Sequence, residues 1–378
     1  MATEYLTNDI ELTSVADAIR EKGGTSDPLT YPDGFASAVR AIQTGIVPQL
    51  VVTVSTGATV TATNGSKTIR GTSDSTGVCT LIVPEIGTWS VSATLGGQTS
   101  DTKTVSITDS YAVSLYFVSS TLNDNEWSVI KSVSDAGQGA NYWSIGDRKE
   151  VILDGTVGHL ALSNYTTYAF IIGFNHNQEL EGTNRIHFQL AKTALSGGTD
   201  VCFCDNYCTS PVSTTGYFSM NSSATNSGGW ASSQMRTNIC GTSLSSYSGT
   251  IIAVIPTALR AVLKSVTKYT DNTGNNSTSA SAVTATKDYF FLLSEFEVFG
   301  SISRANSNEA SKQAQYAYYS AGNSKVKYKH NGTSAAARWW LRSPLASNSD
   351  GFENVNTDGT VEDRTARASF GFAPGFCV

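Results

Sequence analysis

The first part of the chain carries apolar residues at helical spacing in two short stretches. In DIELTSVADAIREKGG, residues 9–24, one helical face would hold Leu12, Val15, Ala16 and Ile19. Thr13 or Ser14 is expected to cap this helix, and the two glycines to stop it. In LTYPDGFASAVRAIQTG, residues 29–45, Pro-Asp-Gly makes a turn before a second stripe of Phe35, Ala38, Val39 and Ile42. Helices this short bury little surface alone, so we expect them to pack on each other, on a partner chain or on the next domain.

Residues 46–118 alternate apolar and polar side chains with period two. Stretches such as LVVTVSTGATVTATNG are separated by glycine and asparagine turns at intervals of roughly 8 to 12 residues, which is typical of a β-sandwich. Trp89 is expected in its core. We interpret this segment as an immunoglobulin-like β-sandwich spacer without site chemistry of its own.

Residues 119–378 mix both periodicities and predict a larger α+β domain. TTYAFIIGFNH and NRIHFQLAKT have the composition of core strands. The whole chain is therefore predicted to be α+β, with three parts at 1–45, 46–118 and 119–378.

Three later stretches of this domain give further predictions. Residues 228–270 are expected to contain helices, with one face formed by Ala258, Val262 and Val266. KDYFFLLSEFEVFG, residues 287–300, has the apolar run of a buried strand, and residues 309–322 have a helical pattern.

Composition narrows the functional classes. Of the 378 residues, 40% are hydrophobic and only 15% are charged, which is below the usual quarter. Ser, Thr, Asn and Gly take the place of charge, as in β-rich extracellular or virion proteins. The net charge of -6 argues against nucleic-acid binding. No long apolar run predicts a membrane span, and the N-terminus does not have the pattern of a signal peptide.

The cysteines leave three interpretations. Three of them, Cys202, Cys204 and Cys208, lie within seven residues, and the others are Cys79, Cys240 and Cys377. A zinc site usually needs a second cysteine pair, which the sequence does not offer. A disulfide is the second possibility, and small buried hydrophobic residues are the favoured one.

Candidate catalytic chemistry is sparse. The sequence contains no Gly-x-Ser-x-Gly elbow, P-loop or His-Glu-x-x-His motif. His176 and His187 are expected to be core or edge histidines satisfied by hydrogen bonds. Asp288, Glu295 and Glu297 are the clustered acids, and strand alternation is expected to point them outward. VNTDGT, residues 355–360, suggests a turn rather than a calcium loop.

An ordered series of motifs resembles a known family. The series is YWSIGD, IIGFNHN, GGWASSQMRT, FLLSEFEVFG, QAQYAYYSAGNS, RWWLRSP, VNTDG and GFAPGFCV. It looks like a domain of phages and prophages of gut Firmicutes that is related to the C-type-lectin-like, formylglycine-generating-enzyme-like fold. Some members are the variable proteins of diversity-generating retroelements. The helical segment at the N-terminus is similar to segments of phage tail and baseplate-associated proteins.

This resemblance implies a role for the end of the chain. In such variable proteins a C-terminal region, here about 338–378, is rewritten by error-prone copying at adenines. Trp339, Trp340 and Arg342 would be scaffold, with Arg342 as a buried hydrogen-bond hub. The side chains between positions 345 and 370 would form a hypervariable ligand-binding patch. Its candidate residues are Leu345, Asn348, Asp350, Phe352, Asn354, Asp363, Arg364, Arg367, Ser369 and Phe370.

Codon chemistry and packing leave three questions open within this patch. Mutated AAY codons can give neither Glu353 nor Glu362, which are therefore fixed or come from another adenine-containing codon. The candidates that fit these codons are Asn348, Asp350, Phe352, Asn354, Asp363, Arg364, Arg367, Ser369 and Phe370. Phe352 and Phe370 are either core residues or binding anchors. The run VEDRTAR is either a solvated loop or an adaptable polar binding surface.

Taken together, the resemblance implies a phage receptor-binding or adhesion protein. It would be made in the bacterial cytoplasm and work on the virion tail. It would bind a host cell-surface receptor, attach to other tail proteins through residues 1–45 and form a homotrimer, without a metal or cofactor, nucleic acid or membrane insertion. It is not expected to be an enzyme. The alternatives are a structural tail or decoration protein and, less favoured, an enzyme acting on cell-wall glycan.

Overall fold

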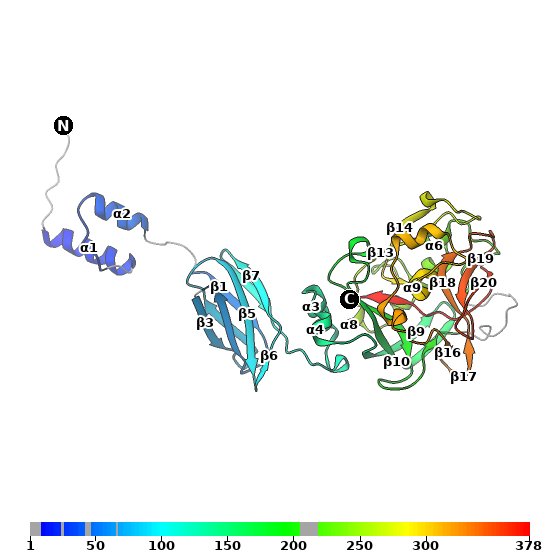
Figure 1. The fold of residues 1–378 in the computed structure, drawn as a ribbon. Coiled ribbons are helices and arrows are strands. Elements are labelled where there is room, and N and C mark those ends of the chain that lie inside the picture. The colour runs from blue at the N-terminus through cyan, green and yellow to red at the C-terminus, as the bar shows by residue number, and fades with distance from the viewer. Residues whose placement is uncertain (1–8, 24–25, 42–46, 66, 205–217) are drawn as a thin grey trace. The chain divides into compact units, whose positions relative to one another are not determined.

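The computed structural model describes residues 9–23, 26–41, 47–65, 67–204 and 218–378. These residues form helices and many strands in several sheets, which confirms the mixed α+β class (Figure 1). Contacts divide the chain into two compact units, unit 1 (Met1–Phe117) and unit 2 (Val118–Val378).

Unit 1 begins with a hairpin of two helices, α1 (Asp9–Gly23) and α2 (Asp33–Ala41). Both predicted helices are confirmed, and Ala16 and Ile19 of the first stripe are buried. The predicted cap of α1 is wrong, because the helix begins one turn earlier and the Thr13 hydroxyl donates to the Asp9 carbonyl at 2.6 Å. Ile42 and the end of the second stripe lie outside the described residues.

Two sheets follow in unit 1. One has the strand order β4-β1-β8, with β1 and β8 parallel, and the other has the order β3-β2-β5-β6, with β7 also paired to β5. The strands are β1 (Gln49–Thr53), β2 (Thr59–Asn64), β3 (Lys67–Thr72), β4 (Val78–Ile82), β5 (Gly87–Leu95), β6 (Gln98–Thr99), β7 (Lys103–Ile107) and β8 (Ser110–Ser114).

Alternate residues of both sheets share one apolar core. Leu50 of β1, Val60 of β2 and Ile107 of β7 are fully buried in it. Trp89 is also fully buried, as predicted, and its indole N–H donates to the Glu85 carbonyl at 3.2 Å. The period-two pattern therefore reports real burial on one face of each sheet.

Unit 2 is built around a five-stranded antiparallel sheet of order β15-β21-β11-β10-β9. Its strands are β9 (Arg148–Val157), β10 (Leu160–Phe174), β11 (Ile186–Lys192), β15 (Phe290–Phe291) and β21 (Gly375–Cys377), so both predicted core strands are confirmed. The last strand of the chain lies inside the sheet. Phe376 stacks on Phe188 with ring centroids 5.2 Å apart, and Trp127 packs edge-on against Phe188 at 5.7 Å. The C-terminus is therefore part of the core.

Short elements surround this sheet. The helices are α3 (Trp127–Asp135), α4 (Gly139–Tyr142), α5 (Gln178–Glu181), α6 (Gly229–Ser232), α7 (Ile251–Val254), α8 (Thr257–Arg260), α9 (Glu295–Phe299) and α10 (Ala317–Ser320). Leu122–Asp124, Ala280–Ala282 and Ser307–Lys312 form 3-10 turns, and Met235–Cys240 forms a π-helix. The remaining strands are β12 (Val201–Cys202), β13 (Val266–Asp271), β14 (Val283–Asp288), β16 (Lys327–Lys329), β17 (Gly332–Ala337), β18 (Trp339–Pro344), β19 (Gly351–Val355) and β20 (Val361–Thr365).

Several predicted elements of unit 2 are corrected. The strand predicted over 287–300 ends early, because Ser294 caps a helix there: its hydroxyl accepts from the Glu297 N–H, and Glu297 accepts from the Ser294 N–H. Val266 opens β13 instead of continuing a helical face. The helix predicted over 309–322 is reduced to the end of a 3-10 turn and the short α10. Among the described residues, no helix combines the length and apolar character needed to span a membrane.

Candidate functional site

The predicted variable region forms a three-stranded sheet of order β18-β19-β20. Every residue of β18 and β19 is buried, whereas every residue of β20 is half-buried. Within the part of the chain that the structure describes, β20 pairs only with β19. The sheet therefore consists of two buried strands, β18 and β19, which we call the platform, and one edge strand, β20, at the surface.

The candidate ligand-binding residues divide between surface and core. Asn348 and Arg367 are exposed, and Asp350, Asp363 and Arg364 are half-buried; we call these five the displayed residues. The remaining five are buried: Leu345, Phe352, Asn354, Ser369 and Phe370. Buried side chains cannot contribute to an exposed patch, so the predicted binding role is wrong for them.

The position of β19 in the middle of the sheet explains part of this burial. Phe352 has no exposed surface, and Phe370 packs on Trp340 with ring centroids 4.8 Å apart. The Trp340 indole N–H donates to the Phe218 carbonyl at 2.8 Å, and Trp339 is fully buried as well. Phe352 and Phe370 are therefore core residues, and the two tryptophans have the packing expected of a scaffold.

Charged side chains lie along the edge strand β20. Asp363 forms an ion pair with Arg304. Glu362 points to the opposite face, since neighbours on a strand alternate, and it pairs with Arg338 and, at 3.2 Å, with Arg364. Pairs this exposed contribute only about 0.2–1 kcal/mol each. Contacts to a ligand could therefore replace them at small cost.

An open recess lies beside this edge. Small and hydroxyl side chains and one arginine line it, namely Thr278, Ser303, Arg304, Ala305, Ala346, Ser347 and Val361. Its lining includes the start of the loop that carries Asn348 and the first residue of β20. The displayed residues thus have a concave surface next to them.

The wall of the recess is held by a buried carboxylate. Glu295 is buried and accepts hydrogen bonds from the Ser303 N–H at 2.7 Å, the Ser303 hydroxyl at 2.6 Å and the Ala305 N–H at 3.0 Å. Asp288 and Glu297 are also buried, so the prediction that these acids point outward is wrong. On helix α9 the two glutamates point in different directions, and each is buried against partners of its own: Ser303 and Ala305 for Glu295, and Arg342 and Lys268 for Glu297.

A second buried carboxyl group lies against the first. Glu353 of β19 has no exposed surface, and neither of its carboxyl oxygens has a hydrogen-bond partner among the described residues. Burial raises the pKa of Glu353 well above its usual range, and the charge of Glu295 acts in the same direction. A buried carboxylate without a hydrogen-bond partner is costly, so the fold favours the neutral form of Glu353.

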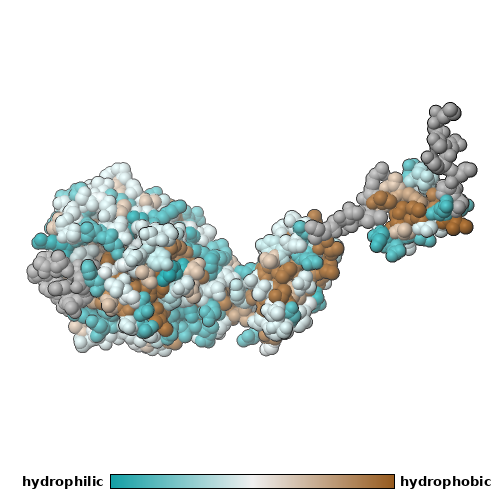
Figure 2. All heavy atoms as spheres, turned by 180° about the vertical axis from the view of Figure 1, so that it is seen from behind, coloured by the Kyte–Doolittle hydropathy of each residue, from teal (hydrophilic) through white to brown (hydrophobic). Residues whose placement is uncertain are grey.

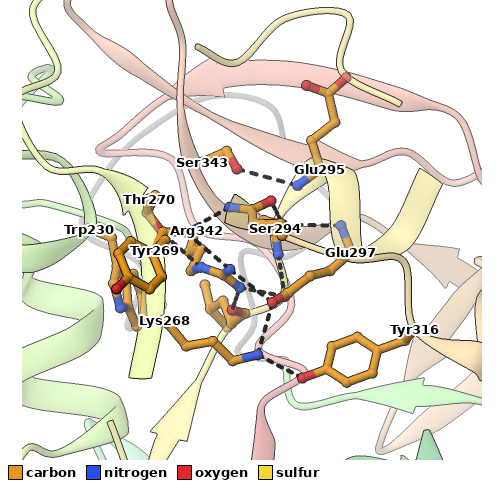
Figure 3. Close-up of polar contacts among 12 residues, drawn as sticks. Trp230, Lys268, Tyr269, Thr270, Ser294, Glu295, Glu297, Tyr316, Arg342 and Ser343 are labelled. Atoms are coloured by element: carbon orange, nitrogen blue, oxygen red, sulfur yellow. Dashed lines mark hydrogen bonds and ion pairs between the residues drawn. The ribbon is translucent and has the colours of Figure 1, made fainter. Parts of the chain in front are cut away.

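Arg342 of β18 connects the platform to neighbouring elements of unit 2 (Figure 3). Its guanidinium is fully buried and donates to both Glu297 oxygens, at 2.5 and 2.9 Å. It also donates to the Thr270 hydroxyl at 2.7 Å and the Leu292 carbonyl at 2.9 Å. Burial alone would raise the pKa of Glu297, but the charges of Arg342 and Lys268 outweigh it and hold that pKa below its usual range. Arg342 is thus a buried hub whose main partner is an anion.

Lys268 extends this ion-pair network. Its ammonium donates to Glu297 at 2.9 Å, to Glu181 at 2.7 Å and to the Tyr316 hydroxyl at 2.8 Å. His176, Glu181 and Glu297 also bring metal-ligand atoms within 4.8 Å of one another. A divalent cation at that point would have to displace the ammonium, which already satisfies both carboxylates. We therefore interpret the cluster as an ion-pair network whose cation is a side chain.

The two core histidines have different surroundings from those expected. Burial lowers the pKa of His176 to about 3, and the charge of Lys268 acts in the same direction. His176 stacks on Tyr316 at 3.7 Å between ring centroids, and Nδ1 of His187 lies 3.1 Å from the Tyr316 hydroxyl. Nε2 of each histidine has no hydrogen-bond partner among the described residues. The predicted satisfaction by hydrogen bonds is wrong for those two atoms.

The cysteines of the 202–208 cluster are only partly described. Sγ of Cys202 lies 3.7 Å from Sγ of Cys204, both residues are buried, and Cys208 lies outside the described residues. Burial raises the pKa of the Cys202 thiol well above its usual range. Such a thiol is a poor nucleophile and a poor zinc ligand, which favours the interpretation as a small buried hydrophobic residue.

Sequence reasoning missed the partners of the hub. Glu181 on α5, Lys268 on β13 and Tyr316 before α10 come together only in the fold, and no local motif marks them. One signal was available: Ser294 followed three residues later by Glu297 is the capping-box spacing and would have indicated α9.

One family model matches the chain. It is described as a domain of unknown function (DUF6273), and it matches residues 212–378. No curated protein matches the sequence. The matched region includes β18–β20, the recess and Arg342, and its description names no activity.

Replacing Arg342 with methionine should leave Glu297 buried beside an apolar side chain. We expect the free energy of unfolding of unit 2 to fall by about 3–5 kcal/mol, measured by urea denaturation. Arg342→Lys keeps the charge without two parallel hydrogen bonds and should recover only part of the loss. The exposed Arg367→Lys serves as the matched control and should stay within about 0.5 kcal/mol of the parent protein. A methionine variant as stable as this control would contradict the hub.

Glu353→Gln should change how stability depends on pH. A raised pKa in the fold means that the folded chain holds a proton that the unfolded chain loses near the ordinary value of 4.5. Glu353 therefore costs stability, by up to about 1.4 kcal/mol per pH unit, as the pH rises from that value toward its folded pKa. Glutamine has no titrating proton, so the variant should lose stability less steeply as the pH rises above 4.5 in urea denaturation series.

Glu362→Gln is the matched control for this experiment. The hydrogen bond and charge of Arg338 lower the pKa of Glu362, so its linkage lies below the ordinary value and leaves the neutral range unchanged. Parallel curves for the parent protein and the Glu353→Gln variant would contradict the raised pKa of Glu353.

Proposed function

We propose that this chain is a phage receptor-binding protein that shows a diversified ligand-binding surface on a C-type-lectin-like scaffold. The observation that carries the proposal is the contrast within one sheet. β18 and β19 are wholly buried, while β20 and the loop after β18 carry polar side chains at the surface around a recess. This is how a fold holds an adaptable binding surface on a rigid support.

Substitutions of the displayed residues are expected to change the free energy of unfolding only slightly. Substitutions at exposed positions usually alter stability by less than about 0.5 kcal/mol, whereas truncating a buried aromatic residue costs about 3–5 kcal/mol. Asn348, Asp350, Asp363, Arg364 and Arg367 can therefore vary without loss of the fold. Diversification would be confined to these positions and would spare the buried candidates.

The two glutamates outside the AAY pattern fit this division. Glu353 is fully buried in the core, which favours a fixed residue. Glu362 lies on the edge strand between two arginines, where its replacement would free Arg338 and Arg364 for a ligand. Recognition by such a surface is non-covalent and needs no cofactor.

The remaining parts complete the proposal. The two-sheet part of unit 1 would be an immunoglobulin-like spacer, and the helical hairpin would attach the protein to other tail proteins. The working location would be the virion tail, and the receptor a protein or glycan on the host surface. A symmetric oligomer, such as a trimer, would add avidity to weak single sites.

Removing displayed side chains should abolish attachment without unfolding the chain. We expect Asn348→Ala combined with Arg364→Ala and Arg367→Ala to lower adsorption to host cells at least about tenfold, a loss of about 1.4 kcal/mol. The control replaces the exposed Thr156, Ser163 and Thr166 of β9 and β10 with alanine and should adsorb normally. A folded variant that adsorbs like the parent protein would point to a structural tail or decoration protein.

Sequencing this gene across one phage population tests diversification separately. Substitutions should fall at adenines in the codons of the displayed residues, while the codons for Trp339, Trp340, Arg342 and Glu353 stay constant. A uniform gene, with adsorption still lost in the triple variant, would indicate a fixed adhesin.

A further inference from the structure

The helical hairpin of unit 1 has an uncovered apolar groove. Val15 and Ile19 of α1 and Phe35, Ala36 and Val39 of α2 line it, together with Pro32. Val15 is 50% exposed and Val39 is 51% exposed. Figure 2 shows apolar residues gathered on this hairpin. The groove is formed by both helices, so it is a feature of their packing and not of one residue.

The hairpin by itself buries too little to be stable. Of the residues of α1, only Ala16 and Ile19 are buried. Isolated helices of this length are marginal in water, and tertiary packing of the apolar face supplies most of their stability. A partner that covers the groove would provide the missing burial.

A stripe along α1 indicates which partner fits. Glu11, Val15, Ala18 and Lys22 recur at intervals of four, three and four residues, which places them on one helical face, and all four are exposed. Glu11 and Lys22 lie equally far from the midpoint of the stripe, and so do Val15 and Ala18. One end of the stripe is acidic, the other is basic, and the centre pairs a large residue with a small one.

We propose that this stripe pairs antiparallel with the same stripe of a second copy of the chain. A twofold axis at its midpoint places Glu11 of each copy against Lys22 of the other. It also places Val15 of each copy against Ala18 of the other, so that large packs on small. Two hairpins then form a four-helix bundle, and the groove lined by Phe35 and Val39 becomes its core.

The self-complementary charge favours a second copy over other occupants. A parallel or threefold arrangement would bring like ends of the stripe together, and like charges in contact are destabilising. The pairing therefore replaces the trimer expected from the family resemblance with an even number of copies. It concerns unit 1 and goes beyond the proposed receptor binding, which is a property of unit 2.

Sedimentation equilibrium of the full chain tests the pairing. The expected mass is twice the 40.0 kDa of one chain. Val15→Glu places a charge in the groove and should give the single-chain mass. Ile86→Glu makes the same kind of change at a position that is 61% exposed and outside the hairpin, and it should leave the dimer intact.

Charge reversal then tests the antiparallel register. Glu11→Lys alone or Lys22→Glu alone should weaken the dimer at least about tenfold, because each creates two like-charge contacts. The double variant, Glu11→Lys with Lys22→Glu, restores opposite charges between copies and should regain the dimer. Glu11→Lys puts a positive charge near the N-terminus of α1, and Lys22→Glu puts a negative charge near its C-terminus, so each change is unfavourable for the helix macrodipole. If the variants acted only through helix stability, the double variant would therefore dimerise more weakly than either single variant.

Glu21→Lys is the matched control, since Glu21 is exposed on α1 but lies off the stripe. A parent protein of single-chain mass would overturn the proposal and indicate that another virion protein or the same chain covers the groove. A threefold mass, or a double variant that fails to recover, would overturn it as well. Loss of host adsorption in the triple variant of unit 2 is independent of each of these outcomes.

Discussion

The buried guanidinium of Arg342 requires partners from several segments, and these partners fix the surrounding elements of unit 2. A cation with no exposed surface costs several kcal/mol unless a well-oriented anion and further acceptors surround it. Glu297 supplies both carboxylate oxygens, and the Thr270 hydroxyl and the Leu292 carbonyl take two more N–H groups. The strands β13 and β18, helix α9 and the segment before it are fixed relative to one another as a result.

The partners of Arg342 explain how a surface that tolerates substitutions can lie on a rigid support. Arg342 ties β18 to Glu297, and β19 is held between β18 and β20 by backbone pairing and by the fully buried Phe352. β20 is held by backbone pairing with β19 and by surface ion pairs to Arg304 and Arg338. Its side chains contribute little to the core, so their identities are free to serve recognition.

Among the described residues around Arg342, buried acidic side chains outnumber buried basic ones, so ion pairs alone do not balance their charge. Burial raises the pKa of Glu181 and of Glu309 to about 7, in spite of nearby cations. With Glu353 they make a group of carboxyl groups that hold protons more firmly in the fold than in the unfolded chain. Lys268 and Arg342 together neutralise only two negative charges. The interior is therefore balanced by protons as well as by ion pairs.

The sequence by itself determined the local elements and the class of the fold. Helices α1 and α2, the alternating strands of unit 1, the core position of Trp89 and the strands β10 and β11 follow from periodicity, which depends only on near neighbours in the chain. Only the tertiary structure decided which residues between 345 and 370 face outward, because that depends on β19 lying between two other strands. It also decided the partners of Arg342, since Glu297 and Lys268 come from distant segments. Burial and charge pairing are properties of what packs across the chain, and no local pattern records them.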